Sequence, residues 1–301
     1  MVSAMHIADA LELVQLSPLM EQSSGRPEVL IGLIDGPIAM SHADLNASNI
    51  REVSGISPGA CSRASSAACM HGTFVAGILC AKRGSEAPAI APNCTLLVRP
   101  IFSEITQSTG QMPGASPEEL AIAVIESIDA GASVLNLSAA LAQPSVKGER
   151  DLEQSLDYAA RKGVLVVAAA GNQGSVGSSA ITRHPWVLPV IACDRQGRPT
   201  SESNLGNSIG RRGLGAPGEN ITSLGADGKR RSFGGTSAAT PFVTGAIALL
   251  WSEFPAASGA EIKLAITRSG RQQRNSVVPP LLNAWATYQV MALIHSERRA
   301  S

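Results

Sequence analysis

The sequence predicts an α/β protein in which helices flank a mainly parallel central sheet. Short, nearly uninterrupted apolar runs recur along its 301 residues, as expected of strands buried on both faces. Segments with helical patterning separate these runs, and strands that alternate with helices pair in parallel. Hydrophobic residues make up 44% of the chain and charged residues 16%, which predicts a packed interior rather than general disorder.

The predicted strands and helices follow from these patterns in chain order. A short amphipathic helix is expected over residues 8–20, and strands over 29–34, 96–98, 134–137, 164–167 and 187–192. A further helix is predicted over 117–130, because Ser116, Pro117 and Glu119 form a capping box and Gly131 follows as a stop signal. Residues 201–218 are predicted as loop, residues 242–251 as an apolar helix, and residues 281–294 as a helix that packs back.

One domain is expected, over residues 28–295, with an N-terminal extension (1–27) and a short tail (296–301). Lys plus Arg and Asp plus Glu both number 24, and this balance argues against a nucleic-acid or membrane partner. The N-terminus lacks a cationic, apolar signal sequence, and no apolar run reaches membrane-spanning length. These observations favour a cytoplasmic protein.

The five cysteines bear on both redox state and metal binding. An odd number without a secretion signal predicts reduced thiols, and Cys61 and Cys69 are the pair that lies closest in sequence within a loop. No Cys/His grouping has the spacing of a zinc site, since Cys69 and His71 stand as a single pair. We therefore expect neither a metal nor a cofactor.

Four polar residues are candidates for chemistry, and each has an ordinary structural alternative. Asp35 follows the first predicted strand and could be an acidic turn residue, while His71 opens an apolar helix and could be a cap or a core histidine. Asn172 follows another strand in a Gly-Asn turn, and Ser237 precedes a helix as an N-cap would. Together they stand at strand ends or helix starts, where the edge of a parallel sheet could collect them in one cleft.

The blocks around these four residues resemble the subtilisin (subtilase) family. The matching blocks are Asp35-Gly36, His71-Gly72-Thr73, Asn136-Leu137-Ser138, residues 169–172 and residues 235–241. The resemblance implies a subtilisin-like three-layer fold and a serine endopeptidase. It also implies a catalytic triad of Asp35, His71 and Ser237, with Asn172 completing the oxyanion hole.

The resemblance extends less specifically to the substrate pocket. By this likeness Leu137, Ser138, Ala139 and Ala140 form one wall, Ala169 and Ala170 another, and Arg183 or its neighbour Thr182 the floor. A guanidinium at the floor would favour an acidic or strongly hydrogen-bonding residue before the scissile bond, whereas a solvent-facing Arg183 would not. Main-chain pairing of an extended peptide with Ser138 and with residues 110–112 is expected on either side.

A closer resemblance is to the subtilisin-like proteases that mature cyanobactin-type ribosomal peptides. It rests on residues 34–37, 89–94, 98–103 and 215–221. Macrocyclising members of that group resemble each other in a helical insertion beside the catalytic His, and the interval 36–70 is short and polar here. Leader cleavage by hydrolysis of a peptide substrate, a ribosomal precursor, is therefore favoured. The alternatives are a general intracellular protease, a macrocyclase and a non-catalytic peptide-binding paralogue.

Overall fold

A seven-stranded sheet forms the centre of the computed structural model, which describes residues 5–53, 55, 58–104, 115–138, 146–269 and 276–300. The strand order is β2-β3-β1-β4-β5-β6-β7, and every neighbouring pair is parallel, as predicted. The strands of this sheet are β1 (Leu30–Asp35), β2 (Ile50–Glu52), β3 (Thr95–Pro100), β4 (Val134–Leu137), β5 (Leu165–Ala169), β6 (Val187–Cys193) and β7 (Leu214–Pro217).

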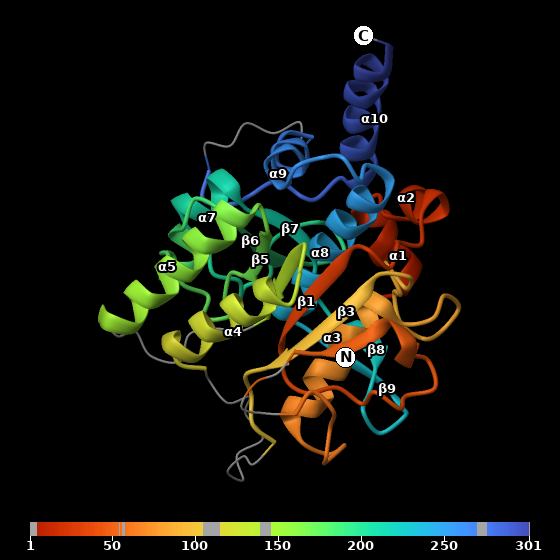
Figure 1. The fold of residues 1–301 in the computed structure, drawn as a ribbon, viewed down its shortest axis with the longest axis vertical. Helices are drawn as coiled ribbons and strands as arrows, with labels where there is room; N and C mark the ends of the chain where they lie inside the picture. The colour runs from red at the N-terminus through yellow and green to blue at the C-terminus, as the bar shows by residue number, and fades with distance from the viewer. Residues whose placement is uncertain are drawn as a thin grey trace.

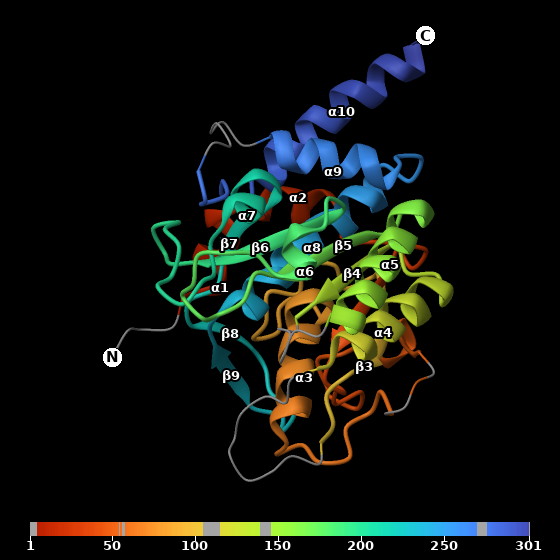
Figure 2. The same cartoon turned by 90° about the vertical axis from the view of Figure 1, so that its left-hand side faces the viewer.

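Helices cover both faces of this sheet (Figures 1 and 2). On one face lie α4 (Pro117–Asp129) and α5 (Val146–Lys162), and on the other lie α3 (Ala67–Cys80) and α8 (Thr236–Glu253). Side chains along each strand alternate between two separate cores, because successive residues point to opposite faces. Ile34 packs with α4 and α5, for example, while Leu33 packs with α3 and α8. This is the three-layer α/β arrangement expected from the sequence.

The predicted helix starting at Pro117 is confirmed, together with its capping box. Ser116 Oγ accepts a hydrogen bond from the Glu119 N–H at 3.1 Å, and the Glu119 carboxylate accepts one from the Ser116 N–H at 3.1 Å. Gly131 then takes a φ of 94°, a left-handed conformation that ends helices and suits glycine. The helix predicted near 242–251 is also present and is longer, since α8 begins at Thr236.

The prediction of one helix over residues 8–20 is wrong. Two helices occupy this segment, α1 (Ile7–Leu13) and α2 (Ser17–Gln22). The chain turns between them at Gln15, whose φ is 53°, and Pro18 sits in the first turn of α2. Proline is tolerated there because the first N–H groups of a helix have no partner within the helix.

The N-terminal segment is fastened to the rest of the molecule. Val14 and Leu16 are both fully buried in the core that contains α3 and α8. The Arg83 guanidinium donates hydrogen bonds to the carbonyls of Met20 at 2.7 Å and Ser23 at 3.0 Å. The Ala284 N–H donates to the Val14 carbonyl at 3.0 Å, so the first and last helices of the described chain meet.

The prediction of a loop over residues 201–218 is also wrong in part, since this stretch contains α7 (Asn207–Arg212) and β7. The glycines of this stretch weaken the sequence patterns by which helices and strands are predicted. The packing nevertheless requires glycine here. A Cβ at Gly210 would lie 1.8 Å from the Ser276 carbonyl oxygen. Elements that the sequence did not announce are the 3-10 turn η1 (Ala47–Asn49), β2, α6 (Ala180–Arg183), the antiparallel hairpin β8 (Ile221–Leu224) and β9 (Arg230–Phe233), and α9 (Gly259–Arg268).

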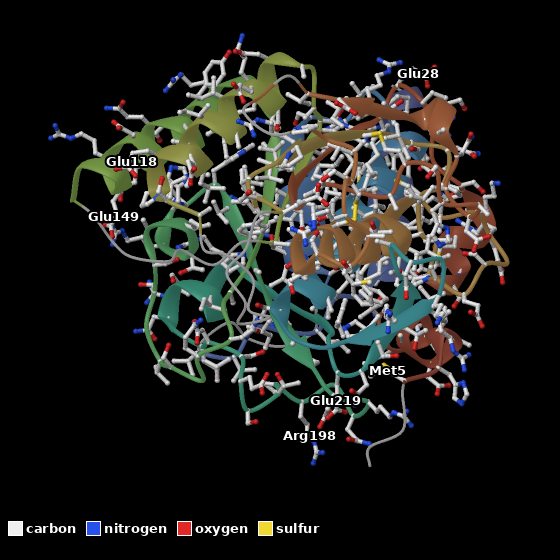
Figure 3. All side chains as sticks on the ribbon, turned by 90° about the horizontal axis from the view of Figure 1, so that it is seen from below. Met5, Glu28, Glu118, Glu149, Arg198 and Glu219 are labelled. Carbon is white, nitrogen blue, oxygen red and sulfur yellow. A yellow bond between two sulfur atoms is a disulfide. The ribbon has the colours of Figure 1, made fainter. Side chains whose placement is uncertain are left out.

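The helix expected over 281–294 is present as α10 (Ala284–Ala300), which includes residues 296–300 of the expected tail. It extends away from the body of the molecule in Figures 1 and 2. Labelled charged side chains such as Glu28, Glu118 and Arg198 point outward at the rim in Figure 3. Among the described residues, none of the helices combines the length and apolarity needed to cross a membrane.

Candidate active site

Asp35 and His71 form the buried part of the candidate site. Asp35 is the last residue of β1 and has no exposed surface, while His71 lies in the first turns of α3. Asp35 Oδ1 is 2.7 Å from His71 Nδ1 and also accepts the Gly36 N–H at 2.6 Å. The end of a strand and the start of a helix thus bring together two residues that are 36 positions apart in sequence.

Two glycines allow this approach of helix to strand. A Cβ at Gly72 would lie 2.5 Å from the carbonyl oxygens of both Gly36 and Pro37, and a Cβ at Gly36 would lie 2.0 Å from the Ala68 carbonyl oxygen. Because real Cβ atoms essentially never come that close to backbone atoms, α3 could not pack here with any larger residue. The His-Gly pair in the sequence is therefore a geometric requirement as well as a motif.

Ser237 completes a chain of hydrogen bonds through the imidazole. Its Oγ lies 3.0 Å from His71 Nε2, on the ring edge opposite the contact with Asp35. Ser237 is the second residue of α8, and the helix begins after Gly235, whose φ of 103° suits glycine alone. The partly exposed hydroxyl and its own N–H thus sit at a helix N-terminus, where unpaired N–H groups favour negative charge.

Asn172 lies beside the start of α8 and is oriented by it. Its side-chain oxygen accepts a hydrogen bond from the Thr236 N–H at 2.8 Å. This contact uses the oxygen of the amide and not its Nδ2 hydrogens. A second hydrogen bond joins the same two segments, because Thr236 Oγ1 accepts the Gly171 N–H at 3.2 Å. The position of Gly235 also matters here, because a Cβ on it would lie 2.9 Å from Asn172 Nδ2. The amide is thus held where it can donate to an oxygen at Ser237.

The electrostatics of the pair favour a protonatable imidazole. Burial by itself lowers the pKa of His71, but the Asp35 charge and the hydrogen bond to it outweigh burial and raise the pKa above its usual value. An imidazole with this support accepts a proton from a hydroxyl more readily. The Phe233 ring is stacked 6.5 Å from the His71 ring and packs edge-on against Phe74. Aromatic packing thus shields one side of the imidazole.

Three supporting residues were not among the predicted site residues, although Thr236 lies in the matching block 235–241, and they are Phe233, Thr236 and Asn204. The Asn204 side-chain oxygen accepts the N–H groups of Gln173 at 3.0 Å and Ser175 at 3.1 Å, and its Nδ2 donates to the Ala170 carbonyl at 3.2 Å. It therefore fixes the loop that carries Asn172. Such a contact spans about thirty positions of sequence, and only the folded chain reveals it.

The residues expected to wall the substrate pocket are described in part. Leu137 is fully buried, and Ser138 Oγ accepts a hydrogen bond from Asn136 Nδ2 at 2.8 Å. Ala169 and Ala170 are buried at the end of β5, directly before Asn172. Ala139, Ala140 and the expected second edge at residues 110–112 lie outside the described residues.

The Arg183 side chain is paired with acidic residues of α5. The guanidinium makes ion pairs with Glu153 at 2.9 Å and Glu149 at 3.1 Å, and 48% of the side chain is exposed. The hydrogen bonds that Arg183 donates to these carboxylates raise its pKa, which keeps the guanidinium charged and paired. The two carboxylates of α5 already compensate the charge of the guanidinium. Arg183 therefore presents little free positive charge to a substrate.

The expectation of five reduced thiols is wrong for two cysteines. Cys61 and Cys69 form a disulfide, because the loop before α3 folds back over the first turn of the helix and brings the two Cα atoms to 5.6 Å. Cys80, Cys94 and Cys193 are free and buried. Burial raises the pKa of Cys94 to about 11 and that of Cys193 to about 12, so neither is an activated nucleophile.

The interval between Asp35 and α3 contains the 3-10 turn η1 and strand β2. All of it is described except residues 54, 56 and 57, and no α-helix occurs in the described part before α3 begins. The space beside His71 is thus bordered by loop and by the Cys61–Cys69 link rather than by a helical insertion.

Comparisons with known proteins place this chain in a family. A family model described as the subtilase family matches residues 26–280. Among curated proteins, subtilisin DY of Bacillus licheniformis is 30% identical over 84% of this chain and 87% of its own length. Subtilisin amylosacchariticus of Bacillus subtilis is 32% identical over 78% of this chain, and the chain covers 58% of that protein.

Solved structures resemble the fold over most of its length. A variant of the protease domain of PatA matches with a TM-score of 0.79 and 27% identity, covering 89% of this chain and 96% of that one. The prenylagaramide maturation protease PagA matches with a TM-score of 0.78 and 26% identity, covering 91% and 98%. The PatG macrocyclase domain has a TM-score of 0.78 at 20% identity, which is a likeness of fold alone.

Proposed function

This chain belongs to the subtilase family of serine peptidases, and on that premise we propose that Asp35, His71 and Ser237 are its catalytic triad, with Asn172 in the oxyanion hole. The observation that carries the assignment is one line of hydrogen bonds through the imidazole. His71 Nδ1 is 2.7 Å from the buried Asp35 carboxylate, and Nε2 is 3.0 Å from the Ser237 hydroxyl. A nucleophile, a base and a group that orients the base are the parts that acyl transfer needs.

In the first half of the reaction, Ser237 Oγ attacks the carbonyl carbon of the scissile peptide bond. His71 Nε2 takes the hydroxyl proton as the bond forms and then gives it to the leaving amine, which departs and leaves an ester on Ser237. A water molecule repeats the sequence and releases the carboxylate. Asp35 accepts the hydrogen bond from the His71 Nδ1–H, which keeps the proton on Nδ1, and it stabilises the imidazolium.

The negative charge that develops on the substrate oxygen is stabilised from two directions. Asn172 Nδ2 is available because the other amide atom is held by the Thr236 N–H at 2.8 Å. The Ser237 N–H lies at the start of α8, where the helix favours an anion. Loss of one such donor lowers the rate about 100- to 1,000-fold, a magnitude established for subtilisin itself rather than derived from this chain.

For the substrate, we favour the leader of a ribosomally made precursor peptide, cleaved by hydrolysis. The likeness to the PatA protease domain and to PagA at 26–27% identity, over nearly the whole of each chain, supports this choice. The described part of the interval before α3 carries no helical insertion, and this supports hydrolysis over macrocyclisation. A general protease and a macrocyclase are the alternatives to be separated.

The triad is tested with Ser237→Ala and a fluorophosphonate probe. Wild-type protein should be labelled at Ser237, as located by peptide mass spectrometry. The alanine variant should lose labelling and at least about 1,000-fold of peptidase activity, because it lacks the nucleophile. Its unfolding temperature should stay close to that of wild type. Activity in the variant within about tenfold of wild type would refute the triad.

The substrate class is tested by comparing unfolded casein with a peptide library. Cleavage confined to a narrow set of library sequences, with casein left largely intact, is the expected result for a maturation protease. Extensive digestion of casein would identify a general protease. The product masses distinguish hydrolysis from macrocyclisation. After hydrolysis, the summed masses of the products exceed the mass of the substrate by one water. A cyclic product weighs one water less than the linear peptide of the same sequence.

A further inference from the structure

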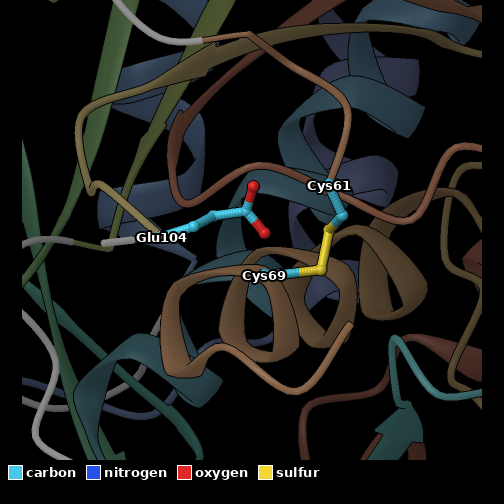
Figure 4. A group of neighbouring side chains, drawn as sticks. All are labelled: Cys61, Cys69 and Glu104. Carbon is cyan, nitrogen blue, oxygen red and sulfur yellow. A yellow bond between two sulfur atoms is a disulfide. The ribbon is translucent and has the colours of Figure 1, made fainter. Parts of the chain in front are cut away.

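The loop before the His71 helix is fastened by a covalent bond. Cys61 lies in this loop and is joined to Cys69, which is fully buried in the first turn of α3. His71 follows two residues later on the same helix. The disulfide therefore ties the loop to the part of α3 that presents the imidazole (Figure 4).

The same loop is fastened a second time, by the carboxylate of Glu104. Its oxygens accept hydrogen bonds from the Ser62 N–H at 2.8 Å, the Ser62 hydroxyl at 2.6 Å, the Arg63 N–H at 2.8 Å and the Ser66 hydroxyl at 3.2 Å. Burial opposes ionisation of Glu104, but these hydrogen bonds outweigh burial and lower its pKa. Each carboxylate oxygen is used twice, so Glu104 is a fixed anion.

Ser66 connects Glu104 to the first turn of α3. It is the N-cap of α3, and its hydroxyl oxygen accepts the Cys69 N–H at 3.1 Å while its proton is directed at Glu104. An N-cap fixes the first turn of a helix by satisfying one of its free N–H groups. Glu104 thus acts on the first turn of α3 through the loop and also through the cap.

The segment that carries Glu104 also contacts Asp35. It continues from β3, and the Ile101 N–H donates to the Asp35 carbonyl at 2.8 Å. Phe102, which is 3% exposed, packs against Ala68 at the start of α3. Residues 101–104 therefore contact both the strand end that holds Asp35 and the helix start that holds His71.

We propose that Glu104 is a positioning residue for His71. Glu104 and the Cys61–Cys69 disulfide are two fasteners, because each holds the loop before α3 in place. The rate of catalysis therefore depends on whether the disulfide is oxidised or reduced. This inference rests on the proposed function. Reduction by two thiol equivalents transfers two electrons to the disulfide, yields two cysteine thiols, and leaves the reductant as its own disulfide. Glu104 then holds the loop alone.

The size of the effect follows from the geometry of proton transfer. His71 must meet both Asp35 and Ser237 at hydrogen-bond distance, and small displacements of a catalytic group cost large factors in rate. Either fastener alone should keep most of this geometry. Loss of both should release the loop and the helix start together.

A metal site is the rival explanation of the same three side chains. One ligand atom from each of Cys61, Cys69 and Glu104 lies within 4.8 Å of the others. Zinc binds thiolates, and here the two sulfurs are bonded to each other. The Glu104 oxygens are also occupied by four hydrogen bonds within the loop. These contacts favour the fastener.

The test uses four forms of the full chain, which are wild type, Glu104→Gln, the double variant Cys61→Ser with Cys69→Ser, and the triple combination. Wild type and Glu104→Gln are also measured after tris(2-carboxyethyl)phosphine. Glu119→Gln is the matched control, because Glu119 is also a carboxylate that accepts backbone N–H at a helix start but lies on α4. The readouts are the rate of Ser237 labelling by a small fluorophosphonate, its pH profile, and kcat and KM for one peptide.

Each single loss should lower the labelling rate about 3- to 10-fold, and both together about 100-fold or more, exceeding the product of the two. KM should change less than about twofold, because the binding walls are untouched. The acid limb of labelling should move to lower pH. Asp35 is the charged group in contact with His71 among the described residues, and loosening that contact lowers the imidazole pKa. The reduced wild type keeps the Glu104 charge and should shift in the same direction.

Four results would overturn the inference. One is labelling of Glu104→Gln within about twofold of wild type in both redox states. Another is a loss that follows only the unfolded fraction, with an unchanged pH profile. A third is an equal loss in Glu119→Gln. Stoichiometric binding of Zn²⁺ by the reduced protein that requires Glu104 would make the cluster a metal site. Failure of wild type to label at Ser237 would instead count against the proposed function.

Discussion

The two halves of the candidate site are built in different ways. The acid–base half is buried, and the backbone of Gly36 and Gly72 lets α3 touch the end of β1, where Asp35 has no exposed surface. The oxyanion half is open, since Asn172 is exposed and its side-chain oxygen accepts a hydrogen bond from the Thr236 N–H. Burial strengthens the interaction between Asp35 and the imidazole, whereas an oxyanion donor must stay accessible to the substrate carbonyl.

This difference predicts that the buried half loses more when it is changed. Asp35→Asn should lower kcat/KM about 10,000-fold, because the imidazole loses both its tautomer control and its counter-charge. Asp35 raises the pKa of His71 and burial lowers it, so removal of the Asp35 charge should lower that pKa. The acid limb of the pH–rate profile should therefore move to lower pH. A residual profile with an unmoved or higher acid limb would show that Asp35 does not set the His71 pKa.

The open half predicts a smaller loss that falls on kcat. Asn172→Ala should lower kcat about 100- to 1,000-fold with KM within about threefold, because the amide acts mainly on the developing charge. Asn204→Ala is the matched comparison, since Asn204 holds the same loop through hydrogen bonds from the Gln173 and Ser175 N–H groups. Its kcat should fall about tenfold or less. A larger loss in Asn204→Ala than in Asn172→Ala would exchange their roles.

The close backbone approach of the buried half can be tested separately from its charges. Gly72→Ala places a Cβ 2.5 Å from two carbonyl oxygens, so α3 must shift away from β1. Unfolding free energy should fall by about 1–3 kcal/mol, and kcat by about 10- to 100-fold. Gly177→Ala is the control, because a Cβ there meets nothing within 4 Å. Chemical denaturation and steady-state kinetics on both variants would check the pair, and equal behaviour would contradict the packing argument.

The smallest effect is expected at Arg183, which lies outside both halves. Arg183→Ala should change the free energy of unfolding by less than about 1 kcal/mol, because its two ion pairs are exposed to solvent. The preference for the residue before the scissile bond should stay within about twofold in a peptide library, because the removed charge was already compensated. A marked gain or loss of cleavage after acidic residues would return Arg183 to the pocket floor.

The fold was predictable wherever burial leaves a signature in sequence. Strands such as β5 and β6 are continuous apolar runs because both of their faces are covered, and α4 carries its own capping box. Strand β7 and helix α7 were missed, since glycine at 210, 213 and 215 weakens every local pattern. Those glycines are fixed by neighbours far away in sequence, and local propensity carries no trace of them.

The candidate site also contains residues that local sequence patterns predict and residues that they do not. Asp35, His71, Asn172 and Ser237 could be proposed from sequence because each stands in a block whose glycines and small residues are themselves required by the packing. Asn204 and Glu104 act by hydrogen bonds to backbone groups about thirty to forty positions away, and such contacts leave no local pattern. The cysteine pairing was open for the same reason, because the distance between Cys61 and Cys69 is set by the fold of the loop.

The contact between Val14 and Ala284 has a consequence for how the protein is made. Val14 and Leu16 are buried in the same core as α8, and the Val14 carbonyl accepts a hydrogen bond from a residue 270 positions later in the chain. During synthesis, Val14 and Leu16 leave the ribosome before the residues of α8 and α10 that they contact. This part of the core can therefore close only after Ala284 has been made. Because α8 packs in the same core and carries Ser237, we expect peptidase activity to appear only after that point.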